Sequence, residues 1–349
     1  MRTKCSVLAS DALKKVNDGI GLSIPESLEL FIGACWGHYD DRQLRNIVAT
    51  LQKKGETASE LLGAVKAFRV HRQIYPQEDS LKCLDLCGTG GDRLGLFNVS
   101  TCAAFVVAAC GVKVIKHGGV TFSSTSGSSN VLNELGILPL TDPRVIARTA
   151  KRQLLTFVAS PSLESSSQFR RVRESLAGVT IFNLVAPFLN PVLPKTQLIG
   201  VPNFKHASIM AKVTKELGYS KALIVSGHAG EDEVSILGES HVFRFCESVN
   251  GGDGSVNYDG FSPKSLGLEI CGSIDHLKVS SPAESAQKLK MILGGQKGPL
   301  ADMVALNAAF ALFLAERVPT LKQGLDLAQK TIKGGRPAKL LLRLQGVAA

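Results

Sequence analysis

The chain has 349 residues, of which 44% are hydrophobic and 20% charged, a balance typical of a globular protein with room for two domains. Its 40 lysines and arginines exceed its 30 aspartates and glutamates, and the net charge of +10 favours an anionic partner such as a phosphorylated substrate or a nucleic acid. The apolar run at residues 102–111 is too short to span a bilayer, so we expect no membrane partner. Eight scattered cysteines without a metal-binding spacing, and a first stretch without a secretory pattern, predict a cytoplasmic protein with reduced thiols.

The first 72 residues are predicted to form a small helical domain. Ser23 with Glu26, and Thr57 with Glu60, have the spacing of capping boxes at helix N-termini. The residues after each cap place apolar side chains at helical spacing, which is typical of a buried helix face or a subunit interface.

After residue 72 the pattern changes to short apolar runs that alternate with helical stretches. Six runs are predicted to be strands: "KCLDLCG", "VKVIKHG", "LLTFVAS", "QLIGV", "KALIVSG" and "HVFRFC". This alternation indicates an α/β domain over residues 73–349, with a mostly parallel central sheet and helices on both faces. Ligands of such sheets bind beyond the carboxyl ends of the strands, so the loops after three of these runs can form one cleft.

The first of those loops is rich in glycine. Gly88, Gly90 and Gly91 follow a predicted strand and precede a helix, an arrangement that presents backbone N–H groups to a phosphate. The spacing matches neither the dinucleotide-binding pattern nor the P-loop, and a turn without a ligand is the alternative. Hydroxyl and amide donors that can extend the anion site follow at Asn98, Ser100 and Thr101.

The two other loops supply charge. "KHGGVTFSSTSGSSN" carries Lys116, a point charge suited to a diphosphate, and the alternative for this serine-rich stretch is a flexible linker. Its neutral donors are Ser123, Ser124 and Ser128. Asp232 and Glu233 in "GHAGEDEVS" are adjacent carboxylates of the kind that bind Mg²⁺ beside substrate phosphates, although solvated loop charges are common.

Together these motifs resemble one family, the anthranilate phosphoribosyltransferases of tryptophan biosynthesis. The resemblance covers nearly the whole chain, in the order "KGET", "GTGGD", "NVST", "KHG", "SSTSGS", "TIFN" with "LNP", "QLIGV", "DE" and "LNAA". It implies a fold of the nucleoside phosphorylase and phosphoribosyltransferase type, with the helical domain completed by a segment near residues 172–195 and used to form a homodimer. It also implies transfer of the 5-phosphoribosyl group of phosphoribosyl pyrophosphate (PRPP) to the amine of anthranilate, release of pyrophosphate, and Mg²⁺ as cofactor.

The resemblance also implies roles for individual residues. It places PRPP at Gly88, Gly91, Asp92, Asn98, Val99, Ser100, Thr101, Lys116, Ser123, Ser124 and Ser128. It places the metal at Ser100, Asp232 and Glu233, and the acceptor at Gly88, Arg173, His117 and Gly119. Positioning and electrostatic stabilisation of the leaving pyrophosphate account for such a transfer, so we expect no protein nucleophile.

The acceptor side departs from the family pattern. Gly119 and Val120 stand where the family has Asn and Arg in K-H-G-N-R, and "LESS" at residues 163–166 stands for H-P-A-M. Losing directed contacts can change the preferred acceptor, so a transferase acting on another aromatic acceptor is one alternative. A non-catalytic relative that binds nucleic acid through "FRRVR" is another, and the intact pair of Asp232 and Glu233 argues against it.

Overall fold

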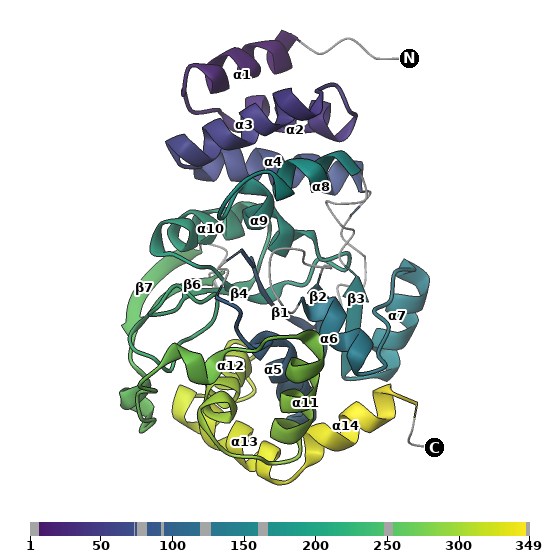
Figure 1. Cartoon of the computed structure of the whole chain (residues 1–349), viewed down its shortest axis with the longest axis vertical. Coiled ribbons are helices and arrows are strands. Elements are labelled where there is room, and N and C mark those ends of the chain that lie inside the picture. The colour runs from purple at the N-terminus through teal and green to yellow at the C-terminus, as the bar shows by residue number, and fades with distance from the viewer. Residues whose placement is uncertain are drawn as a thin grey trace.

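The computed structural model describes residues 7–72, 74, 82–91, 94–118, 127–159, 167–247 and 254–346. The N-terminal helices gather at one end of the molecule, beyond a central sheet (Figure 1). They are α1 (Val7–Asn17), α2 (Ile24–Cys35), α3 (Asp41–Lys54) and α4 (Ala58–His71). Both predicted capping boxes are present, at the starts of α2 and α4.

A sheet of seven strands lies at the centre, in the order β3-β2-β1-β4-β5-β6-β7. The strands are β1 (Leu84–Gly88), β2 (Val114–Gly118), β3 (Leu155–Ala159), β4 (Thr196–Gly200), β5 (Lys221–Ser226), β6 (Ser240–Cys246) and β7 (Ser255–Phe261). β1 to β5 are parallel, whereas β6 and β7 pair antiparallel, which confirms the predicted mostly parallel sheet. The chain moves outward from β1 to β3 and then returns to the other side of β1 with β4, so the strand order reverses beside β1.

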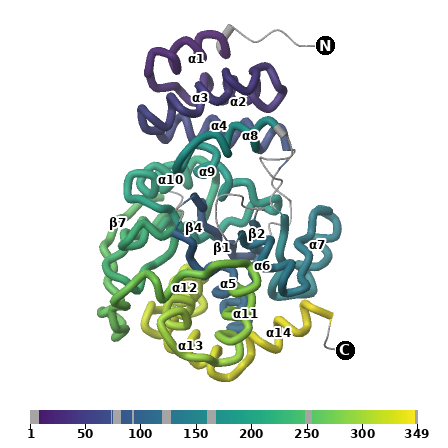
Figure 2. The backbone as a smooth tube through the Cα atoms, in the orientation of Figure 1, coloured from purple at the N-terminus to yellow at the C-terminus, as the bar shows by residue number. Residues whose placement is uncertain are grey.

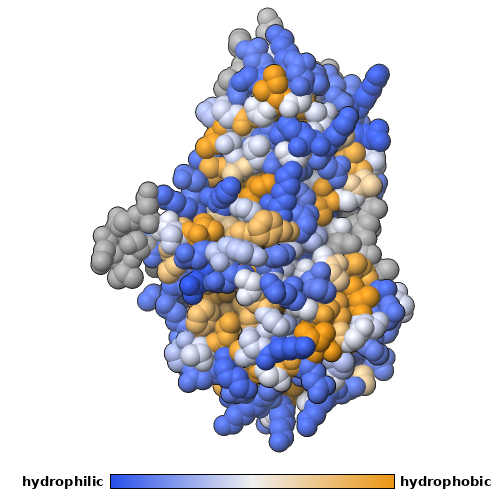
Figure 3. Space-filling model, turned by 90° about the vertical axis from the view of Figure 1, so that its left-hand side faces the viewer, coloured by the Kyte–Doolittle hydropathy of each residue, from blue (hydrophilic) through white to orange (hydrophobic). Residues whose placement is uncertain are grey.

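The six predicted strands all form, and β7 is a seventh that the sequence pattern missed. Its residues Ser255–Phe261 are exposed apart from Phe261. An edge strand that is exposed on both faces has no apolar run or alternation from which to predict it. β7 belongs to the side of the molecule shown in Figure 3, where apolar patches lie among hydrophilic residues.

Helical segments cover both faces of the sheet (Figures 1 and 2). They are α5 (Val99–Ala109), α6 (Ser128–Glu134), α7 (Pro143–Arg152), α8 (Ser167–Glu174), α9 (Ile181–Val185), η2 (Ala186–Leu189), α10 (Phe204–Glu216), η3 (Pro263–Leu266), η4 (Ile274–Leu277), α11 (Pro282–Leu293), α12 (Pro299–Leu314), α13 (Leu321–Lys333) and α14 (Arg336–Leu344). On one face, α5 and α11 to α14 share a hydrophobic cluster with Leu84, Leu86 and Leu198. On the other, α4, α9 and α10 share a second cluster with Cys87 and Ile199. Among the described residues, no helix has both the length and the apolar character needed to cross a bilayer.

The second cluster continues from the sheet into the N-terminal helices. It includes Ala12 of α1, Leu30 of α2 and Ile47 of α3, as well as Phe182 and Phe188 from the segment between α8 and β4. The N-terminal helices therefore share one continuous core with that segment and with one face of the sheet. The domain limits, residues 1–72 with a segment near 172–195 and residues 73–349, stay a prediction.

Candidate functional site

The glycine turn after β1 is held against the loop that follows β5. Gly90 and Gly91 have φ angles of 61° and 86°, in the left-handed region that favours glycine. The backbone N–H of Gly90 donates to Asp232 Oδ2 at 2.8 Å. A Cβ atom on Gly88 would lie 2.0 Å from the same oxygen, so a side chain there would have to displace the Asp232 carboxylate. The glycine turn and the acidic pair thus meet at one edge of the sheet.

Lys116 is buried at the end of β2, beside the start of α5. Its Nζ donates to the carbonyl oxygen of Leu86 at 2.5 Å and to Ser100 Oγ at 3.3 Å. A buried cation requires negative charge nearby, and Lys116 is among the groups that favour the ionised form of Asp232. The backbone N–H groups that open α5 add a second positive contribution. This corner of the molecule is therefore suited to an anion.

The end of β2 lies close to the start of α6. A Cβ atom on Gly118 would lie 2.5 Å from Ser128 Oγ, so a side chain there would have to displace the Ser128 hydroxyl. Lys116, Gly118 and Ser128 line a common small cavity between β2 and α6. Ser128 is therefore brought near Lys116, as a diphosphate pocket needs.

The start of α5 carries three further predicted PRPP residues. Asn98 occupies the N-cap position without a side-chain cap bond, and its Oδ1 accepts a hydrogen bond from Ser285 Oγ at 2.8 Å. Val99 and Thr101 are buried. The hydroxyls of Thr101 and of Thr89 in the glycine turn have no hydrogen-bond partner among the residues that the structure describes. Buried hydroxyls without partners are costly, so a polar ligand reaching them would stabilise the site.

The acidic pair has the chemistry of a hard-cation site. Burial raises the pKa of Asp232 above its usual range, although the hydrogen bond from Gly90 and the charge of Lys116 act in the opposite direction. Glu233 is buried, at 8% exposure, and Asp232 is half-buried, so this pair gains from a bound cation. Carboxylate and hydroxyl oxygens such as those of Asp232, Glu233 and Ser100 are donors that Mg²⁺ prefers. These residues therefore fit Mg²⁺.

Arg173 and His117, two of the predicted acceptor residues, lie in different parts of the structure. Arg173 lies half-buried on α8, which packs against α3, and Phe169 of α8 contacts Phe68 of α4. Arg173 thus belongs to the helical end of the molecule. His117 is 4% exposed, with its ring among β1, β2 and η2 rather than beside Lys116. Asp92, Gly119, Ser123, Ser124 and residues 163–166 lie outside the described residues.

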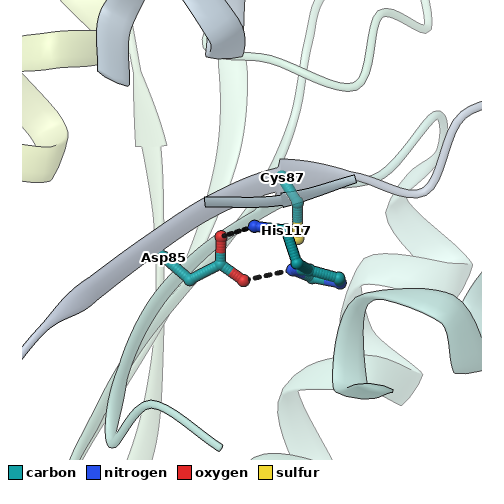
Figure 4. A group of neighbouring side chains, drawn as sticks. All are labelled: Asp85, Cys87 and His117. Carbon is teal, nitrogen blue, oxygen red and sulfur yellow. Dashed lines mark hydrogen bonds and ion pairs between the residues drawn. The ribbon is translucent and has the colours of Figure 1, made fainter. Parts of the chain in front are cut away.

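A buried polar group that the sequence interpretation missed lies under the glycine turn. Asp85 is fully buried in β1, facing His117 (Figure 4). Asn190 and Gln197 each donate to its Oδ2 at 3.0 Å. The signal was present, because an aspartate in the middle of the apolar run "KCLDLCG" requires buried donors. The sequence could not identify the donors, because Asn190 and Gln197 lie 105 and 112 residues after Asp85.

Known proteins match nearly the whole chain in sequence. The sequence pattern of the glycosyl transferase family, a/b domain, matches residues 80–338. The anthranilate phosphoribosyltransferase of Aquifex aeolicus (strain VF5) is 35% identical over 337 residues, which cover 96% of each chain. The chain belongs to the anthranilate phosphoribosyltransferase family.

Solved structures of the anthranilate phosphoribosyltransferase family share this fold. The protein from Thermus thermophilus has a TM-score of 0.84 at 31% identity, covering 97% of this chain and 99% of its own. The protein from Saccharomyces cerevisiae, in complex with PRPP and Mg, has a TM-score of 0.83 at 24% identity, covering 97% of both chains. The predicted α/β fold with additional N-terminal helices is thereby confirmed.

Proposed function

We propose that this protein transfers the 5-phosphoribosyl group of PRPP to the amine of anthranilate and releases pyrophosphate. The observation that carries the proposal is the meeting of the glycine turn, Lys116 and Asp232 at the carboxyl edge of the sheet. Identity of 35% to an anthranilate phosphoribosyltransferase over 96% of both chains supports the same reaction. The net charge of +10 agrees with two anionic substrates.

PRPP binds in this proposal with its diphosphate between the glycine turn, the start of α5 and Lys116. The residues assigned to it are Gly88, Gly91, Asp92, Asn98, Val99, Ser100, Thr101, Lys116, Ser123, Ser124 and Ser128. Backbone N–H groups and the ammonium supply donors and charge, while the hydroxyls of Thr89 and Thr101 mark buried polar atoms that a ligand can satisfy.

Asp232, Glu233 and the Ser100 hydroxyl would hold Mg²⁺ in this site. When bound, Mg²⁺ offsets negative charge on the diphosphate and favours its departure. Lys116 and the first N–H groups of α5 stabilise the same developing charge from protein atoms that are already in place. No protein nucleophile is needed, because an amine held on the opposite face of the ribose attacks with inversion.

The acceptor is assigned to the side of the site nearer the helical end. Arg173 supplies a guanidinium suited to the carboxylate of anthranilate, and Gly88 and Gly119 belong to the same predicted set. His117 completes the set predicted from the sequence. Since Asn and Arg of the family pattern are absent at Gly119 and Val120, Arg173 is left to make the main directed contact.

We also propose that two chains associate through the N-terminal helices. Large apolar side chains are exposed at this end, with Ile20 at 51%, Trp36 at 69% and Val70 at 53%. Covering such side chains is favourable on association. The cytoplasmic location stays a prediction from the sequence.

One experiment tests the function directly. The protein is incubated with PRPP, Mg²⁺ and anthranilate, and both loss of anthranilate fluorescence and release of pyrophosphate are followed, beside a panel of other aromatic amines. We expect turnover of anthranilate. Turnover of another amine alone would replace the acceptor. Absence of pyrophosphate release with every acceptor, together with a salt-dependent affinity for DNA, would overturn the proposal in favour of nucleic-acid binding.

The metal site is tested by calorimetry of PRPP binding with and without Mg²⁺. We expect the magnesium-dependent heat to disappear when Asp232→Asn and Glu233→Gln are combined. The matched control is Asp326→Asn on α13, which removes a carboxylate from an exposed pair with Lys322. Unchanged binding in the double variant would contradict the assignment of Asp232 and Glu233.

A further inference from the structure

A second polar cluster lies on the face of the sheet opposite Lys116. Successive strand residues point to opposite faces, so His117 faces η2 while Lys116 faces α5. Asp85 and Cys87 point to the same side as His117 from the neighbouring strand β1 (Figure 4). This cluster lies beneath the proposed PRPP site. The proposed reaction gives a role to only one of its members, the predicted acceptor contact of His117, and none to Asp85 or Cys87.

The ring of His117 is enclosed by two acceptors. Its Nδ1 contacts Asp85 Oδ2, and its Nε2 lies 3.1 Å from the carbonyl oxygen of Ala186. A neutral imidazole carries one N–H and can donate to only one of them. A carbonyl oxygen cannot donate, so Nε2 must carry a proton to make its bond. The proton at Nδ1 then depends on whether Asp85 is ionised.

The neighbours of Asp85 require it to be ionised. Asn190 Oδ1 accepts from the backbone N–H of Val192 at 3.0 Å, which orients its NH₂ group toward Asp85. Gln197 Oε1 accepts from the hydroxyl of Tyr219, which orients the NH₂ of Gln197 in the same way. Every other contact of the Asp85 carboxylate is thus a donor, including the backbone N–H of His117 at 3.3 Å. A carboxyl group surrounded by donors is acceptor-only.

The electrostatics of Asp85 agree with its contacts. Burial raises the pKa of an aspartate, but the nearby charge and hydrogen bond of His117, the charge of Lys116 and the amide of Asn190 outweigh it and lower the pKa of Asp85. A buried carboxylate needs a compensating cation. The ring of His117 is the group in direct contact with it.

We propose that His117 is a buried imidazolium paired with the Asp85 carboxylate, and that it acts as a positioning residue for Lys116. Its two N–H groups join the end of β2 to β1 on one side and to η2 on the other. Because Lys116 is the adjacent residue of β2, the same bonds hold its ammonium at the diphosphate end of the site. The kinetic part of this inference rests on the proposed function, whereas the charge of His117 does not.

The segment formed by α9 and η2, whose Ala186 contacts His117, also contacts α4 and the glycine turn. Arg69 of α4 donates to the carbonyl oxygen of Phe188 at 3.1 Å, and Asn183 of α9 donates to that of Thr89 at 3.4 Å. His117 therefore lies between the helical end and the strand that carries Lys116. Loss of one N–H would release either Asp85 or Ala186 and leave a buried acceptor without its donor.

The cluster does not suit a metal ion, although ligand atoms of Asp85, Cys87 and His117 lie within 4.8 Å of one another. Both ring nitrogens of His117 are engaged by protein oxygens. Cys87 Sγ accepts from Gln197 Nε2 at 3.3 Å, and burial raises the pKa of its thiol well above the usual range. A neutral thiol and a protonated imidazole are not metal ligands.

The first test is spectroscopic and uses the full-length protein labelled with ¹⁵N-histidine. We expect both ring nitrogens of His117 to carry protons at neutral pH, each split by a directly bonded hydrogen, with the signal identified by its loss in His117→Gln. The ionisable groups around the ring are Asp85, Cys87 and Lys116, with Tyr219 and Arg69 beyond Gln197. An unprotonated nitrogen would overturn the proposal. This measurement needs neither turnover nor a folded variant, since the remaining histidine signals can be assigned by their own substitutions.

The second test separates positioning from acceptor contact. In His117→Gln we expect the KM for PRPP to rise about tenfold, as loss of one charge-assisted hydrogen bond predicts, while the KM for anthranilate stays within about twofold. The matched control, His241→Gln, removes a half-buried histidine on β6 that contacts the Tyr258 hydroxyl at 2.8 Å, and should leave both values unchanged. A rise confined to the KM for anthranilate would overturn the positioning role. Absence of turnover in the wild-type protein would instead count against the proposed function, with the charge of His117 still decided by the spectroscopic test.

Discussion

At the scale of single residues, the site contains glycines at which a side chain would collide with Asp232. Gly88 has a carboxylate oxygen of Asp232 at the position of its missing Cβ, and Gly200 has the Asp232 backbone carbonyl there, at 1.4 Å. Gly200 is therefore required by the close approach of the Asp232 backbone, and Gly88 by that of the Asp232 carboxylate, whereas neither residue has a left-handed φ angle. Gly90 and Gly91 differ, because their φ angles are positive.

The crowding at Gly88 makes a direct prediction. In Gly88→Ala the new methyl group must displace the carboxylate of Asp232, so we expect magnesium-dependent PRPP binding to weaken by about tenfold or more and the free energy of unfolding to fall by about 1–3 kcal/mol. Calorimetry and urea denaturation measure the two effects. The control is Gly272→Ala, where nothing lies within 4 Å of the added Cβ. Equal binding by the two variants would show that Asp232 does not depend on the space at Gly88.

At the scale of elements, the N-termini of α2 and α4 are joined through buried glutamates. Glu60 is fully buried in the first turn of α4, where its carboxylate accepts from the backbone N–H groups of Leu22 and Thr57 and from Lys54 Nζ, at 3.0, 2.9 and 2.9 Å. It thus caps its own helix and also holds the loop before α2. A capping box read from local sequence therefore has a tertiary role as well.

Replacing Glu60 tests that double role. In Glu60→Gln, the charge is lost and an NH₂ group faces donors, so we expect the free energy of unfolding to fall by about 3 kcal/mol. Chemical denaturation measures the loss. Asp326→Asn is the control, because its exposed ion pair with Lys322 contributes only about 0.5 kcal/mol. Similar losses in both variants would refute the structural role of Glu60.

Glu26 at the start of α2 predicts a dependence on pH. Hydrogen bonds from Lys15 and from the backbone and side chain of Ser23 lower its pKa from 4.5 to about 2. A lowered pKa in the folded state stabilises the protein above the pKa of the unfolded chain, and this contribution is lost as pH falls toward about 2. We expect Glu26→Gln to be less stable than the wild-type protein at pH 7, with the difference shrinking below about pH 4.5. Denaturant titrations at pH 7 and below about pH 4.5 measure the stability difference between the two proteins. A difference that does not change with pH would contradict the lowered pKa of Glu26.

At the scale of the whole molecule, the helical end and the sheet share one core. Phe182 of α9 lies between Phe68 of α4 and Phe169 of α8, with ring centroids 6.2 and 5.3 Å away. The same cluster reaches Ile199 and Ile224 in the sheet. Because apolar contact is continuous between the two parts, neither can lose its packing without exposing the other.

This continuity predicts one cooperative unfolding transition. We expect calorimetry to give equal calorimetric and van't Hoff enthalpies, and Phe182→Ala to lower the free energy of unfolding by about 3–5 kcal/mol while keeping a single transition. Phe204→Ala, which removes a ring that is 45% exposed, is the control and should cost far less. Two separate transitions would show that the helical end unfolds independently.

The features that could be predicted from the sequence are those that leave a pattern in neighbouring residues. Apolar runs and alternation predicted six of the seven strands, and residue spacing predicted the capping boxes at Ser23 and Thr57. β7 was not predicted because its residues are exposed apart from Phe261, so its sequence has neither an apolar run nor an apolar–polar alternation. The proximity of the glycine turn to the acidic pair followed from the rule that carboxyl ends of parallel strands share one edge.

The sequence by itself therefore determined the fold class and the family, and it predicted that the glycine turn and the acidic pair lie at one edge of the sheet. Only the tertiary structure decided which buried groups are partners, as with Asp85, whose side chain contacts His117, Asn190 and Gln197 from three different parts of the chain. The physical reason is that the spacing of apolar residues along the chain indicates whether a residue is buried, but not which distant residue it contacts. The charge state of His117 depends instead on two oxygens brought to its ring by folding, one of them 69 residues away.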